Sequence, residues 1–500
     1  MSNMSFVPVS SDLASQISPA PADTALVSLF GGNVYAIGGR IRDALVGYFH
    51  NRSVPEPKDL DYVITGFTLP EVVAKFEASG AKVNAVGASF AVLKVTIGGT
   101  AVDVALPRRE RSTGPGHRDF AVDFGPEVSI VEDALRRDFT INALCLRLSD
   151  WHLIAPDGSL YDLRHGIVRA ISEQSFDDDP LRMLRAAQFA SRLGFEIEPR
   201  TFLQMASKAS AITHCSPERI RDEFIKLLEK SERPSQGMTL LRDSGLLAHV
   251  IPELLEGVGF VQNRHHAFDV WDHVMAALDA SAAKGDDLST RVAVLLHDIG
   301  KPRTAAPRPD GEGNTFYGHE AVGAVMAADI LRRLRFSEDF VEGVRLAVSE
   351  HMFATRQSSG EELPDAAVRR FIRRVGLANV DRQFAVRYAD IKGKGGDIGA
   401  ALARNAAFEG RVRKLMRENA PISVRELSIS GEDVIQILVE RGIRPENYRG
   451  GREVGVILER LLETVIEDPR AGEREALLAK CADLANEIDV ARASVAPAAR

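Results

Sequence analysis

The spacing of apolar residues changes partway along this 500-residue chain, and this change constrains the fold more than any other feature. From about residue 25 to about residue 170, short β-rich runs such as NVYAIG, DYVIT and AVDVAL alternate with turns. From Asp178 onward, apolar residues recur at helical spacing with few strand signals. The pattern predicts a mixed α/β head followed by a largely all-α body.

Composition limits the class of protein. A content of 45% hydrophobic and 26% charged residues is typical of a globular protein, and the length allows three or more domains. Cys145, Cys215 and Cys481 are too few and too scattered for a disulfide framework, so we expect buried thiols in a reducing compartment. We find neither a signal peptide nor a membrane span in the sequence, and therefore expect a cytoplasmic protein with no membrane partner.

The net charge of −8 argues against nucleic-acid binding driven by overall charge. Two local clusters are basic nevertheless. Residues 369–374 hold four arginines, and residues 404–417 hold five basic residues against one acid. Each cluster is either a solvated helix face or a track for nucleic-acid phosphates, whose contacts carry no sequence information.

A Gly-Gly pair and two alternating acids stand in the first part of the chain. Gly38 and Gly39 follow a β-rich run and open a helical pattern, where glycines let the backbone approach a triphosphate and the helix N-terminus favours anionic oxygens. Asp59 and Asp61, two apart on a strand, project to one face and can bridge a pair of Mg²⁺ ions. The alternatives are a plain turn and two exposed acids on an edge strand.

Asp103 interrupts the apolar run TAVDVA. An unpaired carboxylate facing the core would be costly. Asp103 therefore either faces solvent or joins Asp59 and Asp61 as a third carboxylate.

Arg136, Arg137 and Asp138 immediately precede FTINALCLRL, which we expect to be a buried strand. A strand does not need such a triplet, and the alternative is a surface ion pair at its entrance. Together with Gly38–Gly39 and the acids, the triplet resembles the nucleotidyl-transfer site of the class II tRNA nucleotidyltransferases, the CCA-adding enzymes, and their relatives the bacterial poly(A) polymerases. The resemblance covers most of the chain and implies a polymerase-β-like nucleotidyltransferase head.

The resemblance assigns roles to these residues. It implies that Asp59, Asp61 and Asp103 are catalytic, with Mg²⁺ at Asp59 and Asp61. The residues that it implies in nucleotide binding are Gly38, Gly39, Arg42, Arg137, Asp138, Asp179, Arg182 and Arg185. Among them, Asp138 would accept a hydrogen bond from the ribose 2′-hydroxyl and Arg137 would lie near the phosphates.

Residues 108–132 read as a mobile loop with Gly114–Gly116 at its middle. In the resembling enzymes the equivalent loop helps the switch from C addition to A addition. Its presence therefore argues against an enzyme that adds only C.

Asp179 is positioned to cap a helix that starts near Pro180, and Arg182 lies three residues further on the same face. A capping acid with an i,i+3 salt bridge explains this pattern without any function. In the resembling family the acid and the arginine instead mimic a Watson–Crick edge that accepts cytosine and adenine and rejects guanine and uracil. The segment from Ser216, an expected N-cap, to Glu223 resembles the next family motif, a helical support for that pocket.

Histidines and aspartates punctuate helical segments in the middle of the chain. They are His273, His297, Asp298, His319, His351 and Asp390. Their order resembles the HD superfamily of metal phosphohydrolases. Imidazoles and carboxylates from separate helices can chelate a divalent transition metal and activate water. A lone helical histidine is usually structural, but a set of this kind favours a metal site; whether it hydrolyses a substrate stays open.

These patterns divide the chain into five expected parts. They are a flexible leader (1–24), the nucleotidyltransferase head (25–170), a helical nucleotide- and RNA-binding region (171–255), an HD-type domain (256–418) and a C-terminal helical tRNA-binding tail (419–500). Two features depart from the family pattern: the linker 46–58 is long and polar, and Arg40 stands where small residues are common.

The expected function is template-independent addition of CCA to the 3′ end of tRNA from CTP and ATP, with the tRNA bound by its 3′ end and acceptor arm. One alternative is a poly(A) polymerase on the same scaffold. Another is an HD phosphodiesterase whose head only binds RNA.

Overall fold

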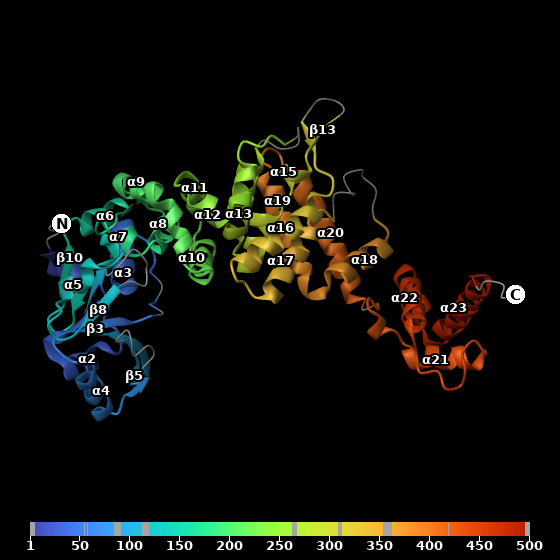
Figure 1. The fold of residues 1–500 in the computed structure, drawn as a ribbon, viewed down its shortest axis with the longest axis horizontal. Coiled ribbons are helices and arrows are strands. Elements are labelled where there is room, and N and C mark those ends of the chain that lie inside the picture. The colour runs from blue at the N-terminus through green and yellow to red at the C-terminus, as the bar shows by residue number, and fades with distance from the viewer. Residues whose placement is uncertain are drawn as a thin grey trace. The chain divides into compact units, whose positions relative to one another are not determined.

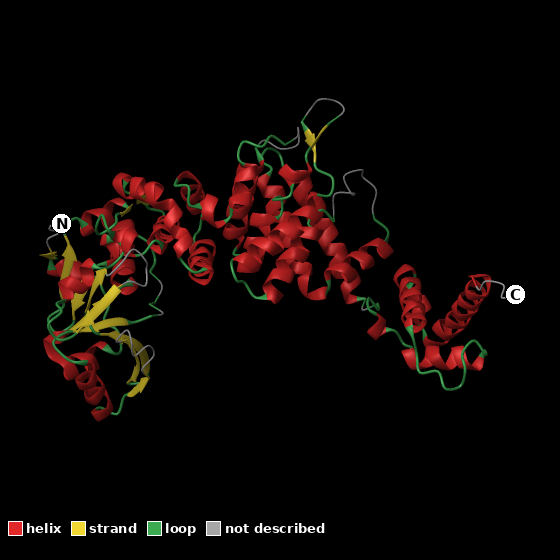
Figure 2. Ribbon diagram, viewed as in Figure 1, coloured by secondary structure: helices red, strands yellow, loops and turns green. Residues whose placement is uncertain are grey.

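The computed structural model describes residues 6–495 apart from 55, 58, 85–91, 113–119, 263–267, 309–312, 354–362 and 419. The chain divides into two compact units (Figure 1): unit 1 holds residues 1–256 and 330–336, and unit 2 holds residues 257–329 and 337–500. Figure 2 shows the large sheet in the N-terminal part of the chain and predominantly helical structure beyond it. The expectation of a mixed α/β head followed by a helical body is confirmed.

An eight-stranded mixed sheet forms the head of unit 1. In spatial order its strands are β1 (Phe6–Pro8), β10 (His152–Pro156), β9 (Cys145–Arg147), β2 (Val34–Ile37), β3 (Asp61–Ile64), β6 (Thr100–Ala105), β5 (Val92–Ile97) and β4 (Lys82–Asn84). The pairing of β3 with β6 is parallel, and the other strand pairs of this sheet are antiparallel. The parallel pair brings the first residue of β3 beside Asp103 on β6.

Helix α3 (Gly39–His50) begins directly after β2, as the Gly-Gly pattern predicts. Gly38 has φ +78°, in the left-handed region that favours glycine, and a Cβ there would lie 3.0 Å from Asp61 Oδ2. A glycine is therefore needed for the backbone to pass so close to this carboxylate. Helix α3 extends to His50, so the first residues of the polar linker 46–58 belong to this helix.

The prediction of a flexible leader over 1–24 is wrong from Phe6 onward. Strand β1 pairs with β10 at the edge of the sheet. The carboxylate of Asp23 is buried and accepts hydrogen bonds from Arg40 Nη1 at 3.0 Å, from Arg40 Nη2 at 2.6 Å and from the Tyr62 hydroxyl at 2.7 Å. Arg40, the residue that departs from the family pattern, is thus the partner that ties this segment to the head.

The segment FTINALCLRL is not one strand. Thr140–Asn142 form a 3₁₀ turn, and only Cys145–Arg147 form β9. Two polar side chains account for the turn: Thr140 Oγ1 donates to Asp162 Oδ2 at 2.7 Å, and Asn142 Nδ2 donates to Asp138 Oδ1 at 2.9 Å. Satisfying these buried groups outweighs the strand preference of the apolar run.

The expected loop 108–132 contains regular structure. Strands β7 (Arg108–Ser112) and β8 (Phe120–Phe124) pair as an antiparallel hairpin, followed by α5 (Ile130–Leu135) with a capping box at Ser129. Gly114–Gly116 lie outside the described residues.

Helices complete unit 1. They are α1 (Ser11–Ala14), α2 (Asp23–Phe30), α4 (Leu69–Ala78), α6 (Ser159–His165), α7 (Ser175–Asp178), α8 (Leu181–Leu193), α9 (Pro199–Lys208), α10 (Pro217–Lys230), α11 (Pro234–Asp243) and α12 (Leu247–Val250). Helix α8 is buried along most of its length and packs against α10 and α11. The short β11 (Ile167–Val168) and β12 (Glu196–Ile197) form a separate parallel pair.

Unit 2 is predominantly helical. Its elements are α13 (Val270–Lys284), α14 (Leu288–Leu296), α15 (Lys301–Thr304), β13 (Ala306–Pro307), β14 (Asn314–Thr315), α16 (His319–Arg333, whose last turn belongs to unit 1), α17 (Glu338–Glu350), α18 (Asp365–Val375), α19 (Val380–Gly393), α20 (Gly399–Arg417), α21 (Gly431–Glu440), α22 (Arg452–Glu467) and α23 (Arg474–Val495). Helices α13 and α19 pack closely: a Cβ on Gly393 would lie 2.6 Å from the His273 carbonyl oxygen. Helices α21 to α23 share a hydrophobic core, to which Ala366 of α18 also contributes.

Arginines of both basic clusters pair with acids. Arg370 Nε and Arg373 Nη1 of α18 donate to Glu463 of α22 at 3.0 and 2.9 Å. Arg413 of α20 donates to Glu409 at 2.6 Å. These guanidinium groups therefore do not form a purely solvated face.

Cys145, Cys215 and Cys481 are buried free thiols, as expected. Within the described ranges, none of the helices combines the length and apolar character that crossing a membrane requires.

Candidate active site and metal centre

Three carboxylates gather at the end of the parallel strand pair. Asp61 is the first residue of β3 and lies opposite Asp103 of β6 in the register. Burial raises the pKa of Asp61, and the charges of Asp103 and Asp59 raise it further. Excess negative charge of this kind fits a divalent cation, whose binding would relieve the repulsion.

Asp59 lies outside the expected strand. It is two residues before the start of β3, so the argument that residues i and i+2 of a strand share a face does not apply to it. Asp59 and Asp61 nevertheless line the same cavity, of about 640 Å³. Asp59 therefore comes from the irregular segment before β3, and Asp61 comes from the strand itself.

A second cavity, of about 570 Å³, adjoins Asp61. Its lining includes all eight residues that the sequence indicates for nucleotide binding: Gly38, Gly39, Arg42, Arg137, Asp138, Asp179, Arg182 and Arg185. Five elements or their ends supply these residues, so the cavity is a product of the tertiary fold of unit 1.

Asp138 is buried and has every acceptor position in use. Its Oδ1 accepts from its neighbour Phe139 N at 2.8 Å and from Asn142 Nδ2 at 2.9 Å, and its Oδ2 accepts from Arg185 Nε at 2.9 Å and Nη2 at 2.6 Å. Burial raises the pKa of Asp138, but Arg185 and Asn142 outweigh it and hold the pKa below its ordinary value. A carboxylate offers about four acceptor positions, so a ribose hydroxyl would have to replace one of these donors.

The two partners of Asp138, Asn142 and Arg185, make further hydrogen bonds on either side of it. Arg42 Nη1 donates to Asn142 Oδ1 at 2.7 Å, and Arg185 Nη1 donates to Glu223 Oε1 at 3.2 Å. Both guanidinium groups lie over the Phe189 ring, that of Arg42 at 4.9 Å and that of Arg185 at 5.4 Å from the ring centroid. One hydrogen-bonded chain therefore joins α3 to α10 along the cavity wall.

Sequence reasoning missed Asn142 and Phe189 as lining residues. Asn142 carried a usable signal, because a polar side chain inside the apolar run FTINAL needs a partner when it is buried. Phe189 lies on the buried face of α8 and carries no signal that distinguishes it from a core residue.

Asp179 and Arg182 line the cavity but do not bond each other. Asp179 Oδ1 accepts from Leu181 N at 3.1 Å, and Asp179 Oδ2 pairs with Arg219 at 2.8 Å. Arg182 Nη2 donates to the Arg136 carbonyl oxygen at 2.6 Å. The expected capping acid is present, whereas the alternative of an i,i+3 salt bridge between the two is wrong.

Helix α10 supplies the partner of Asp179. Ser216 caps this helix, as the sequence predicts, by accepting from Arg219 N at 3.5 Å. The side chain of Arg219 then reaches Asp179. The motif that begins at Ser216 therefore contacts the expected base pocket directly.

Arg136 and Arg137 share one buried partner. Both pair with Asp133, at 2.8 and 3.1 Å, and the Asp133 side chain is fully buried. The interpretation of this triplet as a surface ion pair is therefore wrong. Arg137 and Asp61 line the same cavity, and the positive charge of Arg137 partly offsets the rise in the pKa of Asp61.

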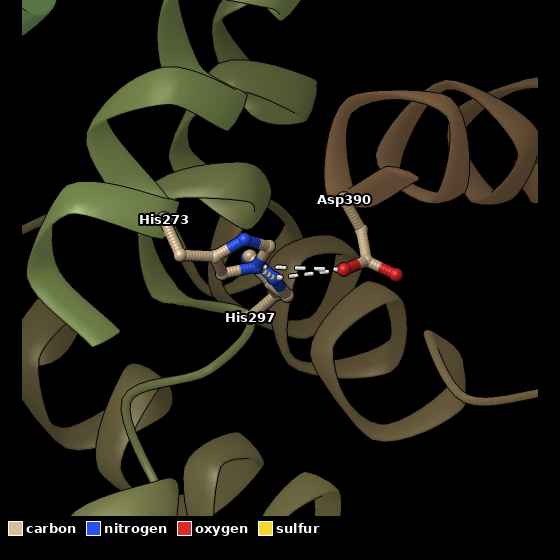
Figure 3. Close-up of side chains that lie close together, drawn as sticks. All are labelled: His273, His297 and Asp390. Atoms are coloured by element: carbon tan, nitrogen blue, oxygen red, sulfur yellow. Dashed lines mark hydrogen bonds and ion pairs between the residues drawn. The ribbon is translucent and has the colours of Figure 1, made fainter. Parts of the chain in front are cut away.

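The histidines and aspartates of the expected HD site meet in the interior of unit 2. All six are buried, and they form two groups whose ligand atoms lie within 4.8 Å of one another. Figure 3 shows the first group: His273 Nε2 lies 3.2 Å from His297 Nε2 and 3.4 Å from Asp390 Oδ1. In the second group, His319 Nε2 lies 3.1 Å from His351 Nε2 and 3.4 Å from Asp298 Oδ1.

Backbone carbonyls orient three of these imidazoles. The Nδ1 atoms of His297, His319 and His351 lie 2.7, 2.7 and 2.6 Å from the carbonyl oxygens of Val294, Phe316 and Val348. A carbonyl only accepts, so each Nδ1 carries a proton, and in the neutral imidazole each Nε2 then turns a lone pair toward the centre. Lone pairs and carboxylate oxygens facing one another in this way are the donor set of a divalent metal.

Three family models match successive parts of the chain. They are the poly A polymerase head domain (34–169), the probable RNA and SrmB-binding site of polymerase A (194–257) and the HD domain (266–390).

Relatives match most of the chain. It is 32% identical over 424 residues to the multifunctional CCA protein of Nitrosococcus oceani, covering 82% of this chain and 97% of that protein. It is 36% identical over 352 residues to the A-adding tRNA nucleotidyltransferase of Deinococcus radiodurans, covering 68% and 76%. Among solved structures, the Bacillus stearothermophilus CCA-adding enzyme in complex with CTP has a TM-score of 0.63 at 21% identity, covering 96% of this chain and all of that one.

A head of this fold, with a carboxylate cluster beside a cavity lined by a Gly-Gly turn and arginines, defines a nucleotidyltransferase. The chain belongs to the family of the CCA-adding tRNA nucleotidyltransferases and poly(A) polymerases, and it carries an HD domain. Membership of this family implies dependence on a divalent metal.

Proposed function

We propose that this chain adds cytidine, cytidine and adenosine to the 3′ end of tRNA, using CTP and ATP and no nucleic-acid template. The observation that carries the proposal is one cavity of unit 1 that holds Gly38, Asp61 and the Asp179–Arg182 pair. The name of one relative, the A-adding tRNA nucleotidyltransferase of Deinococcus radiodurans, supports tRNA as the acceptor. We propose that the tRNA is bound by its 3′ end and acceptor arm. These substrates make the cytoplasm the expected compartment.

The head residues divide the work of the transfer. Asp59, Asp61 and Asp103 would hold Mg²⁺, which activates the tRNA 3′-hydroxyl and neutralises charge on the leaving pyrophosphate. The Gly38–Gly39 turn and the N-terminus of α3 bind the triphosphate. The 3′ oxygen of the tRNA forms a bond to the α-phosphorus of the nucleotide, and the bond from that phosphorus to the oxygen bridging the α- and β-phosphates breaks. Pyrophosphate leaves with the electron pair of the broken bond. The proton of the 3′-hydroxyl passes to solvent.

The base is selected by side chains. Arg182 donates to cytosine O2 and N3 or to adenine N1, and Asp179 accepts from the exocyclic amine of either base. To do so, Arg182 exchanges its bond to the Arg136 carbonyl oxygen for the base, whereas Arg219 keeps Asp179 in place. Guanine and uracil present the opposite donor and acceptor pattern.

Addition of adenosine alone is the second candidate function, because one relative, 36% identical to this chain, is an A-adding enzyme. Incorporation of [α-³²P]CTP into tRNA that lacks its 3′ CCA separates the two. A CCA-adding enzyme labels this tRNA and also extends tRNA ending in CC with ATP. An A-adding enzyme gives only the second reaction.

We also propose that the centre in unit 2 binds a divalent transition metal and hydrolyses a phosphoester. The three Nε2 lone pairs fixed by backbone carbonyls support a nitrogen-rich site. His273, His297 and Asp390 would hold one ion, and Asp298 would be a further ligand, because its Oδ2 lies 3.1 Å from His273 Nε2. His319 and His351 would complete a second metal site or bind phosphate. Release of phosphate from a phosphomonoester, abolished by a chelator and restored by added metal, tests this activity.

A further inference from the structure

The carboxylate of Asp23 is a buried group to which the proposed transfer gives no role. Asp23 is 4% exposed. Its Oδ1 accepts from Arg40 Nη1 at 3.0 Å and from the Tyr62 hydroxyl at 2.7 Å, and its Oδ2 accepts from Arg40 Nη2 at 2.6 Å and from Ala20 N at 2.7 Å. A carboxylate offers about four acceptor positions, so the donors of the chain itself fill this one.

Two of the partners of Asp23 are sequence neighbours of the candidate active site. Arg40 is the residue after the Gly-Gly turn, and Tyr62 is the residue after Asp61 on β3. The turn and the Asp61 carboxylate lie close together, because a Cβ on Gly38 would be 3.0 Å from Asp61 Oδ2. Asp23 therefore joins the residue after the turn to the residue after the proposed metal-binding carboxylate.

The guanidinium group of Arg40 is engaged in this contact. Besides its bonds to Asp23, its Nη2 donates to the Ser18 carbonyl oxygen at 2.6 Å. Arg40 lines the cavity that holds Asp59 and Asp61, but its two terminal nitrogens face acceptors of the N-terminal segment. Arg40 therefore links two segments of the chain, and its charge is not directed at a phosphate.

A buried ion pair of this kind can serve as an anchor alone, but its placement indicates a further role. Asp23 lies before residues 34–169, which match the poly A polymerase head domain, whereas Arg40 and Tyr62 lie within them. The N-terminal segment thus holds the head at the two elements that form its site. Groups that bind a metal and a triphosphate must be held within about 0.5 Å of the productive geometry, which requires support from the residues around them.

We propose that Asp23 is a positioning residue for nucleotidyl transfer: through Arg40 and Tyr62, it sets the distance between the phosphate-binding turn and the carboxylate of Asp61. The inference rests on the nucleotidyl transfer proposed above for the same site. Asp23 is absent from the described residues that line the two cavities. Its loss should therefore impair the binding and use of the metal–triphosphate complex and leave the binding of tRNA unchanged.

Asp23→Asn tests the proposal, because it keeps the shape of the side chain and removes the charge that holds Arg40. Both candidate functions use ATP, so the probe is Mg²⁺–ATP. Its Kd, measured by isothermal titration calorimetry on the full chain without tRNA, should rise about tenfold, and kcat for adding A to tRNA ending in CC should fall by a similar factor. The KM for this tRNA should not change.

Two further variants accompany it. Tyr62→Phe removes only the bond to β3, keeps the ion pair with Arg40, and should change Kd and kcat in the same direction by a smaller factor. Asp150→Asn is the matched control, because it breaks another acid–arginine pair of the head, with Arg147 at 2.7 and 2.9 Å, and neither residue lines the two cavities. This control should match the wild-type protein in Kd and kcat.

Melting temperatures separate positioning from anchoring. A lower melting temperature of Asp23→Asn with the wild-type Kd and kcat would mean that the pair only anchors the N-terminal segment, and would overturn the proposal. An equal change in Asp150→Asn would also overturn it. If Asp23→Asn did not fold, Tyr62→Phe would decide the question. A wild-type protein that bound Mg²⁺–ATP but extended no tRNA would refute the proposed function, and the calorimetric comparison would still decide the role of Asp23; one that bound no Mg²⁺–ATP would refute both.

Discussion

Asp61 lies directly opposite Asp103 in the parallel pairing of β3 with β6. Burial raises the pKa of Asp61, and the negative charge of Asp103 raises it further. We therefore predict that Asp61→Asn lowers CTP incorporation by about three orders of magnitude, because the variant loses a carboxylate that holds the metal. Binding of tRNA, measured by filter retention, should stay within a few-fold. Asp157→Asn, an exposed acid in the turn before α6, is the matched control. Normal incorporation by Asp61→Asn would refute the metal assignment.

Arg182→Ala should impair the choice of base more than the rate with the best substrate. A good bidentate contact is worth about 1–3 kcal/mol of base discrimination, so the ratio of kcat/KM for CTP to that for UTP should fall by roughly tenfold or more. Arg200→Ala, an exposed arginine of α9, should leave this ratio unchanged. An Arg182→Ala protein with the wild-type preference for CTP would rule out selection by this side chain.

Asp138→Asn should reduce the preference for CTP over dCTP. The ribose 2′-hydroxyl must replace one of the groups that already donate to Asp138, such as Asn142 Nδ2 or Arg185 Nη2. A carboxylate accepts a hydrogen bond from a hydroxyl more strongly than the side-chain amide of the Asn variant does. The ratio of kcat/KM for the two nucleotides checks this prediction. If the ratio were unchanged in a folded variant, ribose selection would lie elsewhere in the cavity.

The same substitution should also change how stability depends on pH. The folded-state pKa of Asp138 lies below its unfolded value of about 3.9, so its ion pair with Arg185 stabilises the protein above that pH and is lost as pH falls through the folded-state pKa. Other buried carboxylates titrate in the wild-type protein and in the variant alike. The difference between the two proteins therefore isolates the contribution of Asp138. Between pH 5 and pH 3 the melting temperature of Asp138→Asn should fall less steeply than that of the wild-type protein. Parallel curves would contradict the predicted shift.

The two sites should work independently. Replacing His297 and Asp298 by Ala removes a ligand from each histidine–aspartate group and should abolish metal-dependent hydrolysis, yet leave CCA addition within about twofold, because the ligand sets belong to different units. Asp298 also pairs with the buried Lys301 at 2.6 Å, so helicity must be checked by circular dichroism. His351→Gln keeps that pair and is the milder variant. Loss of both activities in a protein of native helicity would mean that the sites are coupled.

Local signals predicted well the features that depend on neighbouring residues. The Gly38–Gly39 turn, the cap at Ser216 and the capping role of Asp179 each follow from the preferences of a few adjacent positions. The sequence also indicated that six histidines and aspartates belong together, and they do meet in the interior of unit 2. Polar side chains near the ends of apolar helices gave this signal, because packing alone rarely explains them.

Features that depend on distant partners could not be predicted in this way. The Asp23–Arg40 pair fixes the N-terminal segment across 17 residues, and Glu463 neutralises Arg370 across 93. The run FTINAL has the apolar character of a buried strand, and only its contacts with Asp138 and Asp162 turn it into a 3₁₀ turn. The spacing of apolar residues along the sequence does not show which distant side chains pair.

The sequence of the product tests the proposed function most directly. A tRNA lacking its last three nucleotides would be incubated with the full chain, Mg²⁺ and all four nucleoside triphosphates, and its 3′ ends would be sequenced. We predict that the ends read CCA and that extension stops there. Addition of A alone, or growth of an A tract, would contradict the proposal.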